Sequence, residues 1–282
     1  MQAIKSLHTA VITIALVAVI AVATLILQVA IGDFPVRFFA FPMNLVVAAV
    51  WLLLLAELYR RRAESRVAKY MLSMEATYLA LALSAAGGVA VGVMAEPPTR
   101  TWPFVVMMLF VLSHLVLITL RGWRNRQGIR WRFLLNHVGL LLALGAGFWG
   151  APDVRELRLS LVESCPASEA YMVEGQSVRL DYEMELKTFS AQYFDNGVPS
   201  DFAARVAIDG EEVTLRVNTP YSYRLGEDIY LVNYEKDLAG RTRCIVQVVR
   251  DGWYPVMVVG IAMMLLAAVL MFLQGAREEV KR

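Results

Sequence analysis

The sequence predicts a polytopic α-helical membrane protein with about six spans and an inserted all-β extracytoplasmic domain. The chain has 282 residues, is 58% hydrophobic and has a mean hydropathy of +0.53, more than an ordinary soluble domain of this length carries. Six apolar stretches are each close to the ~20 residues that cross the ~30 Å hydrocarbon core of a bilayer. Between the fifth and sixth stretches lies a polar segment with the alternation of β-strands.

The apolar stretches also divide the chain. We expect spanning helices at 9–31, 39–57, 77–95, 103–120, 133–150 and 253–274. The third contains Ala85-Ala86-Gly87-Gly88, small residues that let helices approach closely. Four regions follow from these spans: a two-helix membrane hairpin (1–69), a three-helix membrane region (70–150), the β domain (151–252) and a final helix with its tail (253–282).

The distribution of Lys and Arg predicts the orientation. The segments 60–69 and 121–132 each carry five basic residues and fall on the same side of a six-span protein. The opposite loops carry only Arg37 and Arg100. Because basic loops stay in the cytoplasm, we expect an integral protein of the cytoplasmic (inner) membrane with both termini cytoplasmic. The segment 151–252 then lies on the outer, periplasmic side.

Alternating patterns predict antiparallel strands in that outer segment. Period-2 runs occur at 156–162, 177–186, 205–208, 212–217, 229–232 and 244–249. Turn pairs lie between them at Asn196-Gly197, Asp209-Gly210 and Ala239-Gly240. Asp-Gly between two such runs is a strong hairpin signal. We expect a β-sandwich-like or small-barrel domain of about 100 residues.

Two histidines lie inside predicted spans, where ionisable residues are costly and often functional. His114 and His137 flank the basic segment 121–132 and lie at similar depth, roughly 7–11 Å from its edge of the bilayer. A neutral imidazole at that depth can ligate haem iron. The alternative is a structural hydrogen bond to a serine or a carbonyl, which we favour more strongly for His114. Two histidines without a carboxylate or cysteine do not make a closed zinc site.

The helix that carries His137 also contains several glycines. They are Gly139, Gly145, Gly147 and Gly150. Small residues on one helix allow the close approach of a flat ligand such as a porphyrin. They are more common as plain helix-packing positions.

The cysteines and carboxylates exclude several kinds of chemistry. There are 2 Cys and no CxxC, so the chain is not itself a c-type cytochrome and has no thioredoxin-like motif. Cys165 and Cys244 face an oxidising compartment in the predicted topology, where they form either a disulfide or two buried thiols. Asp181, Glu183 and Glu185 alternate with apolar residues and indicate a solvated strand face. Glu227 and Asp228 follow Gly226 and are typical of a turn.

One stretch carries a family resemblance. "VNTPYSYRLGEDIYLVNY", residues 217–234, resembles the "VNxPLxYxGxxxYQxxY" stretch of the ResB/CcsB family. The matching positions are Val217, Asn218, Pro220, Tyr223, Gly226 and Tyr230. His137-Val138-Gly139-Leu140 is similar to the family's "HxGL" helix, and the resemblance covers about residues 70–274. Two additional N-terminal helices, and Leu231 in place of the glutamine, depart from the family pattern.

The resemblance implies a subunit of a cytochrome c assembly complex. Such a subunit helps to move haem b across the membrane and presents it for attachment to apocytochrome c with a ResC/CcsA-type membrane partner. It implies that His137 is an axial haem ligand, whereas His114, the second haem-binding candidate, has no family counterpart. The chain would be a non-catalytic or co-catalytic subunit, with thioether formation belonging mainly to the partner.

Two other functions remain open. One is a membrane-anchored β-domain scaffold that binds no haem, in which His137 is replaceable. The other is a small-solute transporter, which is disfavoured because inverted repeats and acidic residues deep inside the spans are absent from the sequence.

Overall fold

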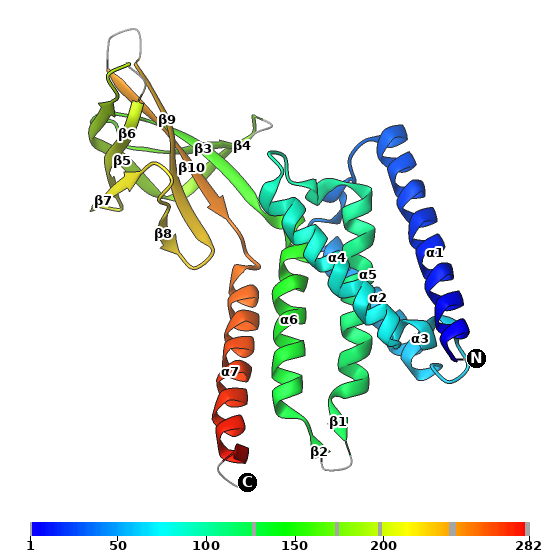
Figure 1. Ribbon diagram of the computed structural model, residues 1–282. Coiled ribbons are helices and arrows are strands. Elements are labelled where there is room, and N and C mark those ends of the chain that lie inside the picture. The colour runs from blue at the N-terminus through cyan, green and yellow to red at the C-terminus, as the bar shows by residue number, and fades with distance from the viewer. Residues whose placement is uncertain (1, 126–127, 173–174, 197–198, 237–240, 280–282) are drawn as a thin grey trace. The chain divides into compact units, whose positions relative to one another are not determined.

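The chain forms two compact units in the computed structural model, which describes residues 2–125, 128–172, 175–196, 199–236 and 241–279 (Figure 1). One unit is helical and comprises Met1–Pro152 with Val256–Arg282. The other comprises Asp153–Pro255 and is built of strands. A polytopic helical protein with an inserted β domain is therefore confirmed as the fold class.

The helical unit has seven α-helices in its described part. Their bounds are α1 (Gln2–Ile31), α2 (Met43–Arg60), α3 (Arg66–Met71), α4 (Met74–Val93), α5 (Trp102–Gly122), α6 (Trp131–Gly150) and α7 (Tyr254–Glu279). Six of them, all but the short α3, are long and apolar enough to cross a membrane. Single-turn 3-10 helices at Val36–Phe39, Pro98–Arg100 and Ala151–Asp153, and a small hairpin of β1 (Arg124–Asn125) and β2 (Gly128–Ile129), complete the connections.

Side-chain caps explain where several helices begin. The Ser65 hydroxyl accepts from Ala68 N–H at 3.2 Å, so part of the basic 60–69 segment forms α3, a helix the sequence did not predict. Ser73 caps α4 in the same way. Thr101 caps α5, with Pro103 in the first turn, where a missing N–H costs nothing.

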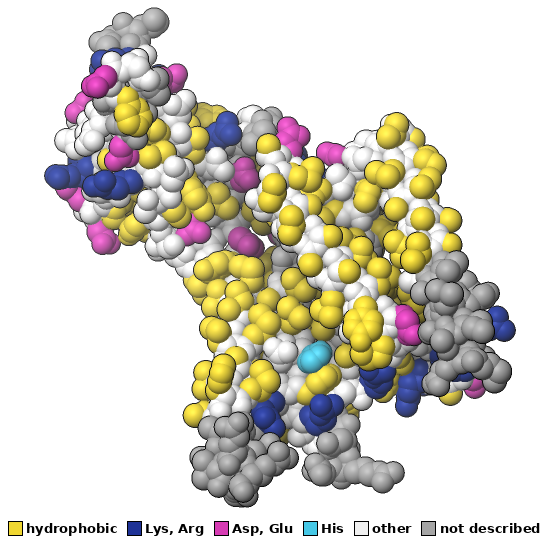
Figure 2. Space-filling model, in the orientation of Figure 1, with side chains coloured by type: hydrophobic (Ala, Val, Ile, Leu, Met, Phe, Trp, Pro, Cys, Tyr) yellow, Lys and Arg dark blue, Asp and Glu magenta, His cyan; other side chains and the backbone are white. Residues whose placement is uncertain are grey.

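Helix α5 is the centre of the helical unit. It packs against α1, α2, α4 and α6, and Leu112 and Leu117 on it are fully buried. Polar contacts tie α2 to this centre: Trp51 Nε1–H donates to Ser113 Oγ at 3.0 Å, and Asn44 Nδ2 donates to the Trp149 carbonyl on α6 at 3.0 Å. The outward faces of the helices are apolar, as Figure 2 shows for one side of the molecule.

Glycines determine the crossing of α6 and α7. A Cβ at Gly139 would lie 2.6 Å from the Gly260 carbonyl oxygen, and a Cβ at Gly260 would lie 2.5 Å from that of Gly139. The two backbones therefore touch, which only glycine permits. Gly145 and Gly147 have nothing within 4 Å of such a Cβ. Helix packing thus accounts for Gly139, while Gly145 and Gly147 border open space.

In its described residues, the β unit is one antiparallel sheet of eight strands. The strands are β3 (Arg155–Val162), β4 (Ala167–Met172), β5 (Ser177–Tyr193), β6 (Pro199–Ile208), β7 (Glu211–Arg216), β8 (Tyr221–Arg224), β9 (Glu227–Lys236) and β10 (Thr242–Arg250). Their order across the sheet is β7-β6-β5-β4-β3-β10-β9-β8. Asp209-Gly210 joins β6 to β7 with φ values of 48° and 84°, as the hairpin signal predicted. Gly197 and the pair Ala239-Gly240 lie outside the described residues.

The sheet curls around a single apolar core. Leu157 and Leu161 of β3, Met184 of β5, Leu215 of β7 and Val246 of β10 all belong to one buried cluster. Strands from both halves of the sheet can share a core only if the sheet bends, and β7 indeed lies near β9. The domain is therefore one coiled sheet, intermediate between the expected sandwich and the expected barrel.

Candidate functional site

His137 lies on the first half of α6 and is held by its own helix. Its imidazole stacks on Phe133, one turn earlier, with ring centroids 3.8 Å apart and an interplanar angle of 22°. Its Nδ1 lies 2.9 Å from the Phe133 carbonyl oxygen. A carbonyl only accepts, so His137 Nδ1–H donates and Nε2 carries the lone pair. This is the arrangement in which a histidine binds a metal through Nε2.

Phe133 is the support on which this geometry rests. A Cβ at Gly122 would lie 2.2 Å from Phe133 Cζ, so the ring packs directly on the backbone at the end of α5. The Arg130 guanidinium lies 4.7 Å from the centroid of the same ring. Phe133 therefore holds the His137 ring from one side and is itself fixed by its neighbours.

His137 lines a cavity of about 580 Å³ in the helical unit. The lining residues are Ile129, Arg130, Trp131, Arg132, Phe133, Asn136, His137 and Met271, so both α6 and α7 contribute. The volume falls within the ~300–1,000 Å³ of cofactor sites. The cavity combines one imidazole, two guanidinium groups and two aromatic rings, which suits a flat, largely apolar ligand with an anionic edge.

His114 has a different environment. It is only 6% exposed, and its Nδ1–H donates to the Met71 carbonyl at 2.8 Å, which ties α5 to the end of α3. Phe110 stacks near it, with ring centroids 6.4 Å apart. His114 therefore makes the kind of structural hydrogen bond to a carbonyl that the sequence favoured over haem ligation. His114 is not among the residues that line the His137 cavity.

In the β unit the family stretch forms two turns, the edge strand β8 and most of β9. Asn218 adopts φ 58° between β7 and β8, and Pro220 follows it on the surface. Gly226 adopts φ 82° between β8 and β9. A Cβ at Gly226 would lie 2.4 Å from the Asp251 carbonyl oxygen, and Asp251 N–H donates to the Gly226 carbonyl at 2.8 Å. The turn is thereby fastened to the segment that follows β10.

The other positions of the family stretch have ordinary sheet roles. Val217 N–H donates to the Phe202 carbonyl at 3.3 Å, which extends the β6–β7 pairing. Tyr230 pairs with Gln247 of β10. Tyr223 packs on the Tyr182 ring with centroids 4.5 Å apart, and its hydroxyl donates to Asp209 at 3.1 Å. The stretch thus serves as a structural element that organises one edge of the sheet.

A polar cluster beside the Gly226 turn was not predicted. Glu227 and Asp228 were assigned to a turn, but both belong to β9. Glu227 is 7% exposed and points inward with Ile229 and Leu231. Tyr182 O–H donates to Glu227 Oε1 at 2.5 Å, and Arg250 Nη2 donates to the same oxygen at 3.1 Å. Burial, and then the bond to Glu227, hold the pKa of Tyr182 well above its usual range.

Charged side chains extend the cluster to the surface. Arg250 also donates to Asp181 at 3.0 Å, and Arg224 donates to the other oxygen of Asp181. The hydrogen bond from Arg224 is the main reason that the pKa of Asp181 lies below its usual range. The Arg224 guanidinium also lies 4.7 Å from the Tyr223 ring centroid. Inward period-2 spacing of Glu227 with Ile229 and Leu231 is the sequence signal that could have revealed this cluster.

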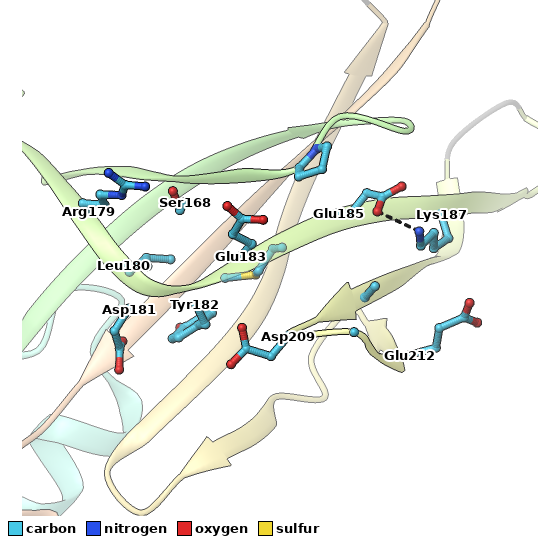
Figure 3. A pocket seen from close by; sticks show the side chains of 14 residues that line it. Ser168, Arg179, Leu180, Asp181, Tyr182, Glu183, Glu185, Lys187, Asp209 and Glu212 are labelled. Carbon is cyan, nitrogen blue, oxygen red and sulfur yellow. Dashed lines mark ion pairs between the residues drawn. The ribbon is translucent and has the colours of Figure 1, made fainter.

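A cleft of about 670 Å³ lies against β5 within the β unit (Figure 3). Asp181, Glu183 and Glu185 line it from alternate positions of β5, and Asp209 and Glu212 line it from the β6–β7 hairpin. Arg179 and Lys187 are the basic residues of its lining, and Lys187 pairs with Glu185 at 2.7 Å. The expected solvated face of β5 is therefore the wall of a cleft with a net negative charge.

Cys165 and Cys244 are free thiols in the structure. Cys244 is fully buried and pairs in register with Leu161, whose side chain is also in the core. Cys165 is exposed and bridges to Val162, the next residue along β3. Neighbouring positions on a strand face opposite sides, so the sheet separates the two sulfur atoms. Burial raises the pKa of Cys244 to about 12, which makes it an unreactive thiol.

Replacement of Gly226 by alanine is expected to destabilise the β unit by about 2 kcal/mol, because the new Cβ meets the Asp251 carbonyl at a positive φ. Thermal unfolding followed by tryptophan fluorescence measures the effect. Gly252→Ala is the matched control, since nothing lies within 4 Å of its Cβ. Equal melting temperatures for the two variants would refute the close approach.

The raised pKa of the Tyr182 hydroxyl predicts that the β unit loses stability at alkaline pH. The pKa of this hydroxyl is higher in the folded state than the unfolded value of 10.0. Its contribution to the free energy of unfolding is therefore complete below pH 10 and is lost as the pH rises above that value. Tyr182→Phe is expected to cost about 1–3 kcal/mol at neutral pH, because Glu227 loses a buried partner, and to flatten the decline between about pH 9 and about pH 11. Melting curves against pH measure both. Tyr171→Phe, at a 48% exposed position, should follow the wild-type curve.

A comparison with protein families finds a match that covers the His137 helix and most of the β unit. Residues 127–246 match the model described as the ResB-like family. The matched segment contains His137 with most of its cavity lining, the Glu227 cluster except Arg250, and the whole 217–234 stretch. No curated protein matches the chain. The ResB-like family is linked to cytochrome c biogenesis. This match to residues 127–246 supports the resemblance of the chain to the ResB/CcsB family.

Proposed function

We propose that the chain is the ResB-like subunit of a cytochrome c assembly complex, and that His137 is an axial ligand for haem on its way across the membrane. The observation that carries the proposal is the His137 cavity. Its imidazole donates from Nδ1 to the Phe133 carbonyl and leaves Nε2 with a lone pair. Haem is cargo here: haem b is bound transiently and passed on to apocytochrome c.

The lining of the cavity supports haem as the ligand. Trp131 and Phe133 offer aromatic surface for a porphyrin, and Arg130 and Arg132 offer guanidinium groups for its carboxylates. Met271 lines the cavity from α7 with an apolar, adaptable side chain. His137 would hold the iron, the aromatic residues would exclude water, and the arginines would orient the charged edge. A second axial ligand would come from a ResC/CcsA-type partner.

The β unit is proposed to lie on the outer side of the membrane and to contact the apocytochrome or the partner. The basic segments 60–69 and 121–132 support this orientation, because both flank the helices at the cytoplasmic side of a six-span topology. The exposed Cys165 and the acidic cleft along β5 give the β unit a polar surface suited to such contacts. Both termini of this six-span topology would be cytoplasmic.

The haem proposal predicts a spectrum that depends on His137. The chain is purified with its ResC/CcsA-type partner, and the visible absorption spectrum is recorded for wild type, His137→Ala and His114→Asn. Low-spin haem bands are expected in wild type and in His114→Asn, which keeps a donor for the Met71 carbonyl. They should fall by at least about tenfold in His137→Ala, because loss of even an outer-shell partner of a metal ligand costs about 10–100-fold in metal affinity.

Two results would reject haem ligation by His137. Unchanged bands in His137→Ala would do so directly. An intact, haem-free complex in wild type and variant alike would favour the membrane-anchored β-domain scaffold instead.

The orientation predicts the reactivity of one thiol. Cys165 is exposed and Cys244 is buried with a raised pKa, so only Cys165 should react with a maleimide at neutral pH. A membrane-impermeant maleimide added to intact spheroplasts is expected to label wild type and to leave Cys165→Ser unlabelled. Labelling only after lysis would place the β unit in the cytoplasm. Labelling only after reduction would reveal a disulfide.

A further inference from the structure

A large apolar cavity of the helical unit lies between α1, α3, α4 and α5, in the part of the chain that precedes the family match. Its volume is about 770 Å³. The walls are mainly hydrocarbon: Leu16 and Ile20 of α1, Leu79 and Leu83 of α4, and Val106 and Phe110 of α5. It is separate from the His137 cavity and shares no lining residue with it.

The cavity exists because α1 is fastened to α5 at one end. Trp102 N–H donates to Gln28 Oε1 at 3.0 Å, and Trp102 Nε1–H donates to the Gly32 carbonyl at 3.2 Å. Further along, the facing residues include Ala21 of α1 and Ala86 and Ala90 of α4, which are too small to fill the space between the helices. Leu16 and Ile20 in the lining are 52% and 42% exposed, so the cavity opens to the surface, where a lipid chain can enter it.

The stretches of α1 and α4 that line the cavity match one leaflet of a bilayer in length. Its lining on α1 extends from Thr13 to Thr24, and its lining on α4 from Leu79 to Ala90. Eleven residue steps at ~1.5 Å each give about 16 Å on both helices. Half of the ~30 Å hydrocarbon core is about 15 Å. The lined stretches of α1 and α4 are therefore about as long as the hydrocarbon half of a single lipid, and the lining continues to Arg66 before α4 and to Pro98 and Thr101 after it.

A basic residue lies at one end of the cavity. Arg66, the first residue of α3, is part of the lining and is exposed. Among the described residues it makes no ion pair, whereas Arg60 and Arg61 both pair with Glu57. A guanidinium group binds phosphate oxygens in a bidentate manner. Arg66 belongs to the basic 60–69 segment, which favours an anionic headgroup.

We propose that this cavity binds one anionic glycerophospholipid, with an acyl chain between α1 and α4 and the headgroup phosphate on Arg66. The lipid fills the space left by the alanines and completes the contact between α1 and the rest of the helical unit. The proposal does not depend on haem binding, since the two cavities have different walls.

Native mass spectrometry of the full-length protein tests the proposal, with phosphatidylglycerol or phosphatidylcholine added in detergent. Ala86→Leu narrows the cavity. Its matched control, Ala82→Leu, adds the same side chain at an exposed position of α4 outside the lining. Arg66→Gln removes the headgroup contact. Lys69→Gln removes one positive charge from the same helix at a position that does not line the cavity.

Wild type and both controls are expected to retain one phosphatidylglycerol, in preference to phosphatidylcholine. Arg66→Gln should reduce the affinity for phosphatidylglycerol by about tenfold and abolish the preference, because a charge-assisted hydrogen bond is lost. Ala86→Leu should reduce the binding of both lipids. Equal retention by all variants would overturn the proposal, as would a photo-crosslinker at Leu79 that captures a polypeptide in membranes instead of lipid.

Discussion

The scarcity of hydrogen-bonding partners inside a bilayer is the constraint on which the helical unit depends. Without water, each polar side chain in a span must find a protein acceptor or donor. Asn44 donates to the Trp149 carbonyl, Trp51 donates to Ser113, and His114 donates to the Met71 carbonyl. These bonds join α2, α3, α5 and α6 where apolar packing alone would leave their rotation undefined, since lipid tails solvate apolar side chains as well as other helices do.

The same constraint gives the two intramembrane histidines different properties. Each donates from Nδ1 to a backbone carbonyl, and each therefore has its lone pair on Nε2. His114 bridges two helices and is buried, so its bond maintains the packing. His137 donates within its own helix and lies against a cavity with two arginines. The bond that satisfies His137 in the bilayer also prepares it as a ligand. In the proposed function, this fixed imidazole is what the chain contributes to haem transfer.

Much of the architecture could be predicted because it follows from simple periodicities. The thickness of the hydrocarbon core sets the length and composition of the spans, and six of them were expected and found. Because one face of each strand is buried, apolar and polar residues alternate along it. β8 is too short, at four residues, to show that alternation, and in β4 only Ala170 is fully buried, so neither strand was predicted. The helix α3 depends on the Ser65 cap, a local hydrogen bond within a run of basic residues.

The parts of the sites that the sequence did not predict depend on the register of the strands. Glu227 was assigned to a turn because it follows Gly226, yet it starts a strand and faces the core beside Tyr182. The contact of Arg250 with Glu227 joins residues 23 positions apart, which no local pattern reveals. Likewise, the two cysteines looked equivalent in the sequence. Their partners on β3 are adjacent residues, which places them on opposite faces of the sheet.

Chemical rescue of His137→Gly is the most direct test of the central claim, that Nε2 of His137 is a haem ligand. The glycine removes the imidazole, and free imidazole added to the purified complex can occupy the vacated space beside Phe133. Return of the low-spin haem bands with imidazole, in a saturable manner, is the predicted result. Bands that imidazole fails to restore, in a variant whose complex with the partner stays assembled, would contradict ligation by this residue.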